Sequence, residues 1–149
     1  VVWVYDGWDG IRLAEIDGVD PNRIAFVDHT DCIPDWYTPI LATSDDVTAD
    51  RADDLRAFLA ATRRGYQAAM ADPAAAADAV LEVAPDLDRD LVERSATFLA
   101  DRYAEDPAAW GVQDAAVWDG FTAFLVEAGL VEDGFDASTA WTGDYLDAD

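Results

Sequence analysis

The residues DCIPDWYTPILATS, numbered 31–44, mark a change of pattern in this chain of 149 residues. They begin as a polar loop, pass through a turn that carries the rings of Trp36 and Tyr37, and end in an apolar run at residues 37–43. Residues before this stretch alternate short apolar runs with turn signals, as strands do, whereas residues after it follow the helical period. We therefore expect a β/α part and a helical part to meet here, at a hinge or the wall of a pocket.

Three short apolar runs predict strands. Residues 1–5 (VVWVY) and 23–27 (RIAFV) are β-branched or aromatic and too short for helices, and residues 11–16 between them have the spacing of a short amphipathic helix. This order of strand, helix and strand is typical of a parallel sheet. The third run, residues 37–43, contains Pro39, which cannot donate a ladder hydrogen bond and belongs at a sheet edge or a strand start. The expected fold class is α/β, with a few mostly parallel strands followed by a predominantly helical C-terminal part.

The helical part is predicted from both apolar spacing and capping residues. Apolar side chains between Leu55 and Ala69 recur at helical spacing and predict a helix of about five turns. Three aspartates are the expected N-caps of later helices, and Gly129 is the expected C-cap of the last one; the aspartates are Asp72, Asp88 and Asp114. The aromatic side chains assigned to the core of this part are Phe58, Phe98, Phe121 and Phe124.

The charge of the chain is strongly negative. Thirty-two acidic residues stand against nine basic ones, for a net charge of -23, and every basic residue is Arg. A field of this sign repels nucleic acid and anionic membrane surfaces, so neither is an expected partner. The acidity is spread along the whole length, which favours a surface adapted to molar salt, where the Debye length is about 3 Å. We expect a halophilic source and a fold that loosens at low ionic strength.

The only His and the only Cys lie in one loop, at His29 and Cys32. Residues three apart in a loop seldom hold a base against a thiol as nucleophilic catalysis requires, and a zinc site needs more His or Cys ligands than this chain has. One Cys also permits no internal disulfide. We therefore predict no catalytic residue and no metal site, and interpret both side chains as structural.

Aromatic side chains near the predicted turns form the candidate ligand-binding site. Its residues are Tyr5, Trp8, Asp9, Trp36 and Tyr37. Ligands of open α/β sheets bind at strand ends, and aromatic faces beside a carboxylate suit a flat, nitrogen-containing or cationic ring. The competing interpretation is that these rings pack in a core, as most aromatic clusters do.

Three segments carry a resemblance to a known family: WVYDGWDG at residues 3–10, IPDWYTPILA at residues 33–42 and LRAFLAATRRGY at residues 55–66. The pattern continues through Asp72 and Pro73 as far as WGVQD at residues 110–114. Together they resemble the later half of the solute-binding proteins of ABC importers. The subgroup is the one related to thiamine-pyrimidine-precursor-binding proteins and pyrimidine synthases.

The resemblance implies a partial type II periplasmic-binding-protein fold, which closes on its ligand like a hinged clamp. Residues 1–28 would end the second lobe, residues 29–36 would cross over as a hinge, and residues 37–149 would return to the first lobe and add the C-terminal helices. The remainder of the first lobe is expected upstream of Val1. The family's Gly-aromatic-Asn-aromatic-Glu pattern falls on residues 4–9, where Gly7 replaces the Asn and Asp9 replaces the Glu. Because of these two replacements, the resemblance does not assign a particular ligand to this chain.

The function implied by the resemblance is that of an extracytoplasmic, membrane-associated substrate-binding component of an ABC importer. It would bind a small aromatic or nitrogen-containing ligand, similar to a thiamine precursor, and deliver it to a membrane permease, with no cofactor. One alternative is an enzyme like the pyrimidine synthases, which hold pyridoxal phosphate on a Lys that this chain lacks. Another is a helical interaction domain whose aromatics are all core. An exposed apolar face also predicts self-association into a homo-oligomer.

Overall fold

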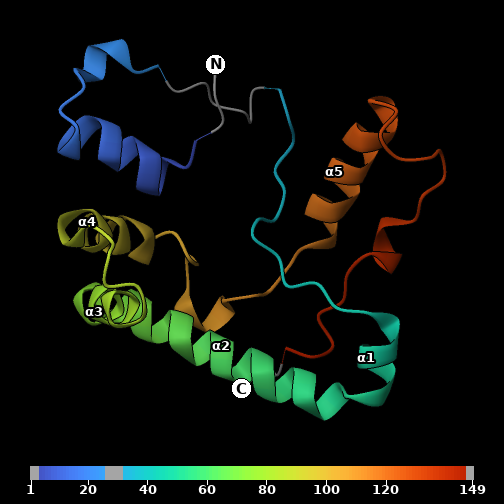
Figure 1. Ribbon diagram of the computed structural model, residues 1–149. Helices are drawn as coiled ribbons and strands as arrows, with labels where there is room; N and C mark the ends of the chain where they lie inside the picture. Colours follow the sequence, from blue (N-terminus) through green and yellow to red (C-terminus); the bar gives the residue numbers. More distant parts are fainter. Residues whose placement is uncertain (1–3, 26–31, 147–149) are drawn as a thin grey trace. The chain divides into compact units, whose positions relative to one another are not determined.

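The computed structural model describes residues 4–25 and 32–146, which form helices joined by turns and irregular segments (Figure 1). The α-helices in these ranges are α1 (Asp45–Asp50), α2 (Ala52–Ala71), α3 (Pro73–Val83), α4 (Arg89–Ala100) and α5 (Ala115–Glu127). Shorter helical turns are η1 (Asp6–Gly10), η2 (Arg12–Ile16), η3 (Pro21–Arg23), η5 (Pro107–Ala109) and η6 (Ala137–Thr139). The described residues contain no β-strand.

The chain divides into two compact units. Unit 1 comprises Val1–Phe26 and Thr62–Trp110, and unit 2 comprises Val27–Ala61 and Gly111–Asp149. One boundary between the units falls inside helix α2, between Ala61 and Thr62. Each unit combines two segments that are distant in sequence. The sequence-based boundaries after residues 28 and 36 refer to lobes and stay a prediction.

Unit 1 is built on the pair α3 and α4, which lie side by side (Figure 1). Both helices begin at an aspartate: the Asp72 carboxylate accepts a hydrogen bond from the Ala75 N–H, and the Asp88 carboxylate accepts one from the Leu91 N–H, each at 3.0 Å. These bonds satisfy backbone donors that a helix leaves unpaired at its start. The buried core between the two helices consists of Ala77, Leu81 and Val92, with Trp8 and Ala96 packed against it.

The turns η1 and η2 add a second layer to unit 1. Gly7 of η1 lies against α4, where an added Cβ would come within 2.9 Å of the Phe98 ring. Beyond it, the Arg94 guanidinium donates to the Glu15 carboxylate at 2.6 Å. An apolar contact and an exposed ion pair therefore both attach the N-terminal turns to α4.

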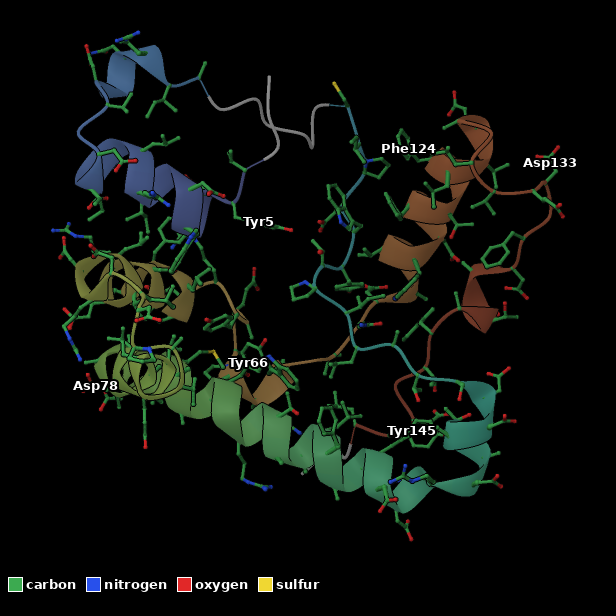
Figure 2. All side chains as sticks on the ribbon, in the orientation of Figure 1. Tyr5, Tyr66, Asp78, Phe124, Asp133 and Tyr145 are labelled. Atoms are coloured by element: carbon green, nitrogen blue, oxygen red, sulfur yellow. The ribbon has the colours of Figure 1, made fainter. Side chains whose placement is uncertain are left out.

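Unit 2 contains α1, α5 and the irregular segment 32–44. The Ser44 hydroxyl accepts from the Val47 N–H and caps α1, and the Tyr145 hydroxyl donates to the Thr48 carbonyl at 3.2 Å (Figure 2). The Arg56 guanidinium lies over the Tyr145 ring, 5.3 Å from its centroid. These contacts join the C-terminal residues of unit 2 to α1 and the start of α2.

The expected α/β fold class, with parallel strands of a type II periplasmic-binding-protein fold, is wrong. Residues 37–43 are irregular, with Ile40 and Leu41 50% and 58% exposed. Tyr5 instead lies at the start of η1, where its carbonyl accepts hydrogen bonds from Trp8, Asp9 and Gly10. Residues 1–3 and 26–27 of the other predicted strands lie outside the described residues. β-Branched and aromatic residues favour a strand only where a neighbouring strand supplies ladder hydrogen bonds, and the described residues supply none.

The helix predictions are confirmed, with one exception concerning burial. Helix α2 spans 20 residues, the three aspartates cap as expected, and Gly129 has the positive φ of 68° that favours glycine after a helix. The assignment of Phe58 to the core is wrong, because its side chain is 55% exposed. Helical spacing places Phe58 on the same face as Leu55 but does not say how much of that face another element covers.

Candidate functional site

An aromatic pocket lies in unit 2, between the segment 32–44 and helix α5. It has a volume of about 120 Å³. Its lining residues, which we call the ring pocket, are Trp36, Tyr37, Ile40, Val117, Trp118 and Phe121. Two of the five predicted site residues, Trp36 and Tyr37, are thus brought together in one cavity.

Stacking positions the rings of this pocket. The Trp36 and Phe121 rings stack with centroids 5.6 Å apart, and the Tyr37 and Trp118 rings lie tilted at 6.3 Å. Offset and tilted pairs at these separations are favourable beyond their buried area. The aromatic side chains of segment 32–44 therefore pack against helix α5. The sequence pattern had instead predicted a strand of a sheet at residues 37–43 of this segment.

Hydrogen bonds hold two of the rings in place. The Asp114 N–H donates to the Tyr37 hydroxyl at 2.7 Å, at the start of α5. The Trp118 indole N–H donates to the Gln113 side-chain oxygen at 3.0 Å, and the Trp118 ring is parallel to the Trp141 ring, 6.1 Å away. The pocket walls are therefore fixed by polar contacts that lie at its edges.

The chemistry of the ring pocket is that of an apolar binding site. No side chain that lines it is charged, and burying a charge without a partner is costly. The Tyr37 hydroxyl accepts a hydrogen bond from the Asp114 N–H. Its own O–H can donate a hydrogen bond to a ligand. The arrangement suits an uncharged ring with a hydrogen-bond acceptor.

The other predicted site residues lie in unit 1, on η1. The Tyr5 side chain is 67% exposed (Figure 2). Trp8 is half-buried against the α3 and α4 core, and the Asp9 carboxylate accepts from the Tyr5 N–H at 3.0 Å. Trp8 and Asp9 thus have structural contacts in η1, and the binding role of all three residues stays a prediction.

A second aromatic cluster in unit 1 was not predicted as a unit. The Tyr66 ring stacks on Trp110 at 4.8 Å and meets the edge of Tyr103 at 4.9 Å. Burial raises the pKa of Tyr103, and the neighbouring Tyr66 adds to the shift. Tyr66 and Trp110 both occur in the segments that carry the family resemblance, but the sequence gave no sign that these two residues, 44 positions apart, are in contact.

A wider and shallower groove lies on unit 2 between α5 and η6, with a volume of about 470 Å³. Asp119, Glu127 and Asp136 line it, together with Phe135. Hydrogen bonds from the Ser138 hydroxyl and backbone N–H lower the pKa of Asp136. The Asp136 carboxylate caps η6 through these hydrogen bonds. Its contacts therefore have a structural explanation and do not indicate a ligand.

The remaining candidate groups are placed as follows. Cys32 is exposed with a free thiol, while His29 lies outside the described residues. Across residues 4–25 and 32–146, no three His, Cys, Asp or Glu side chains are grouped so that they could hold a metal ion. None of the helices in the same ranges has the length and apolar character needed to cross a membrane.

Comparison with known families adds the decisive observation. The NMT1/THI5 like family matches residues 1–76 of the chain. The chain belongs to this family. The matched range contains all five predicted site residues, but it ends before the resemblance noted at residues 110–114. No curated protein matches the chain.

Membership of the NMT1/THI5-like family indicates a substrate-binding or related function for this protein. Most of the family binds substrates, which is consistent with a role other than catalysis. A small-molecule ligand is the corresponding partner.

Proposed function

We propose that this NMT1/THI5-like protein is the extracytoplasmic, membrane-associated substrate-binding component of an ABC importer. It binds a small, nitrogen-containing aromatic ligand similar to a thiamine precursor and passes it to a membrane permease. The observation that carries the proposal is the family match over residues 1–76. The open ring pocket supports it, because that pocket offers aromatic faces and needs no chemical step.

Ring stacking supplies the main part of the expected affinity. Trp36 presents a large aromatic surface beside Phe121, and stacking of a heterocyclic base on an aromatic side chain contributes about 1–3 kcal/mol. Tyr37 contributes a hydroxyl that is already oriented by Asp114. A preoriented donor loses little freedom on binding, which favours affinity.

The proposal is tested by calorimetric titration of the protein with three ligands: 4-amino-5-hydroxymethyl-2-methylpyrimidine, taurine and nitrate. We expect the pyrimidine to bind, and taurine, a zwitterion with a sulfonate group, and nitrate, an anion, to bind weakly or not at all. Trp36→Ala should weaken pyrimidine binding about 10- to 100-fold, because it removes one stacking face.

The matched control is Trp110→Ala, which removes an indole that stacks on Tyr66 in unit 1. It should leave the affinity within about twofold of the unsubstituted protein. A protein that binds none of the three ligands would contradict the substrate-binding proposal. Equal affinities for the two variants would place the ligand outside the ring pocket.

The importer role is tested in cells. Deletion of the gene should abolish uptake of the labelled pyrimidine at low external concentration, and a copy encoding Trp110→Ala should restore it. Protease added to intact cells should remove the protein, as expected for an extracytoplasmic location. Unchanged uptake of the labelled pyrimidine in the deletion strain would contradict the transport role.

A further inference from the structure

The two walls of the ring pocket come from different parts of the chain. Trp36, Tyr37 and Ile40 lie within residues 1–76, which the family match covers. Trp118 and Phe121 lie on α5, beyond that match. The second wall is therefore a feature of this chain that the family match does not describe.

We propose that Trp118 and Phe121 determine the size of the ligand, so that the ring pocket admits one uncharged six-membered ring and excludes fused bicyclic rings. This inference rests on the proposed function and specifies its ligand class. It assigns a role in ligand selectivity to Trp118 and Phe121. Neither the composition nor the family match gives these two side chains such a role.

The volume of the pocket carries the size limit. At about 120 Å³, the ring pocket is slightly smaller than an engineered apolar cavity of about 150 Å³ that binds benzene. A single ring can enter with its substituents directed outward, because Ile40 at the rim is half exposed. A fused second ring does not fit in the remaining volume, so it must either project through the rim without stacking contacts or displace a wall.

The rigidity of the second wall makes the limit effective. Trp118 is held on one side by its hydrogen bond to Gln113 and on another by the parallel Trp141 ring. Phe121 is held between Trp36 and Phe124, whose ring centroid is 6.1 Å from its own. Displacing either ring would disrupt further stacked pairs, so the pocket resists widening.

The charge limit follows from the lining residues. All six are uncharged, and none of them is a cation, so a sulfonate or nitrate anion inside the pocket would be desolvated without a partner. The Tyr37 hydroxyl can donate its proton to a ring nitrogen while it accepts from the Asp114 N–H. A neutral heterocycle with one accessible ring nitrogen matches these contacts.

The experiment compares two probes, 4-amino-2-methylpyrimidine with one ring and 4-aminoquinazoline with two, at mildly alkaline pH, where both are uncharged. Dissociation constants are measured by ligand-observed NMR titration. We expect the one-ring probe to bind at least about tenfold more tightly to the unsubstituted protein. Phe121→Ala widens the pocket and should reduce this preference at least about fivefold or reverse it.

A second variant fills the pocket from its solvent side. Ile40→Trp should weaken binding of the one-ring probe at least about tenfold, and its fold is not at risk because Ile40 is half exposed. The matched control is Leu41→Trp, at an exposed neighbour that does not line the pocket. It should keep the preference of the unsubstituted protein.

The outcomes separate this inference from the proposed function. If the pyrimidine binds but Ile40→Trp leaves the affinity for the one-ring probe unchanged, or Phe121→Ala leaves the preference unchanged, the inference is overturned and the proposed function stands. If taurine or nitrate binds and both ring probes do not, the ligand class is likewise overturned. If the protein binds none of the ligands or probes, both proposals fail. Should Phe121→Ala not fold, the milder Phe121→Leu, which also removes the ring from this wall, takes its place and should likewise reduce the preference.

Discussion

Tyr37 connects two features of unit 2 through one side chain. Its ring lines the ring pocket, and its hydroxyl accepts from the Asp114 N–H at the start of α5. The sequence marked Tyr37 as a ligand residue, but its bond to a residue 77 positions later is a tertiary contact. A single residue therefore belongs both to the pocket lining and to the contacts that hold segment 32–44 on α5.

Tyr37→Phe tests the structural share of this side chain. The change removes the hydroxyl and keeps the ring, so it should lower the free energy of unfolding by about 0.5–1.5 kcal/mol. Urea denaturation followed by circular dichroism measures the loss. Tyr5→Phe, at an exposed ring, is the control and should stay within about 0.5 kcal/mol. Equal stabilities for the two variants would show that the bond to Asp114 adds nothing.

Tyr103 gives unit 1 a pH dependence at the alkaline end. Burial raises the pKa of Tyr103 above its ordinary value of 10.0, with a further contribution from Tyr66. Between the two pKa values the unfolded chain loses this proton and the folded chain keeps it. The contribution to stability is therefore complete below about pH 10 and is lost as pH rises through the folded-state pKa.

Tyr103→Phe should accordingly lose less of its stability than the unsubstituted protein as pH rises through this range. Unfolding free energies measured at several alkaline pH values, normalised to neutral pH, test the expectation. Tyr5→Phe serves as the control and should follow the unsubstituted protein. If Tyr103→Phe declines just as steeply, the alkaline loss belongs to other groups.

At the scale of elements, the approach of η1 to α4 depends on a glycine. A Cβ at Gly7 would lie 2.9 Å from the Phe98 ring and 3.0 Å from the Leu99 side chain. Gly7→Ala should therefore cost about 1–3 kcal/mol by overpacking. Differential scanning calorimetry and urea denaturation measure the change.

The matched substitution is Gly65→Ala in the middle of α2, where an added Cβ meets nothing within 4 Å. It should raise stability by about 0.5–1 kcal/mol, because Ala loses less backbone freedom in a helix than Gly does. Equal effects of the two substitutions would mean that η1 does not depend on its close approach to α4.

Helix ends and helix interiors were predictable to different degrees. Asp72, Asp88 and Asp114 were recognised as caps because capping involves residues only two or three positions apart. Residues 37–43 were taken for a strand because their composition suits one. Whether these residues form a strand depends on a second strand elsewhere in the chain that can pair with them. The composition of residues 37–43 carries no information about such a partner.

At the scale of the whole molecule, charge sets the expected response to salt. In the described ranges every Asp and Glu except the partly buried Asp9 is exposed, and the net charge is -23. Molar salt screens the resulting repulsion. We expect Tm to rise between dilute buffer and molar sodium chloride, measured by calorimetry, although exposed ion pairs such as Arg94 with Glu15 weaken in salt.

The control replaces Asp45, Asp46 and Asp50 of α1 by Asn, which changes the net charge from -23 to -20. Its Tm should depend less on salt than that of the unsubstituted protein. A Tm that is the same in dilute buffer and in molar salt would rule out the halophilic adaptation that we infer from composition.

The sequence by itself determined the family, the charge and the α-helices from α2 onward with their caps, because these depend on composition and on contacts between residues a few positions apart. It also pointed to Trp36 and Tyr37. Only the tertiary structure decided that residues 37–43 pack on α5 instead of forming a strand, that Trp118 and Phe121 complete the pocket, and that Phe58 is exposed. The physical reason is that pairing, burial and cavity shape depend on which distant segments meet, and periodicity along the chain does not contain that information.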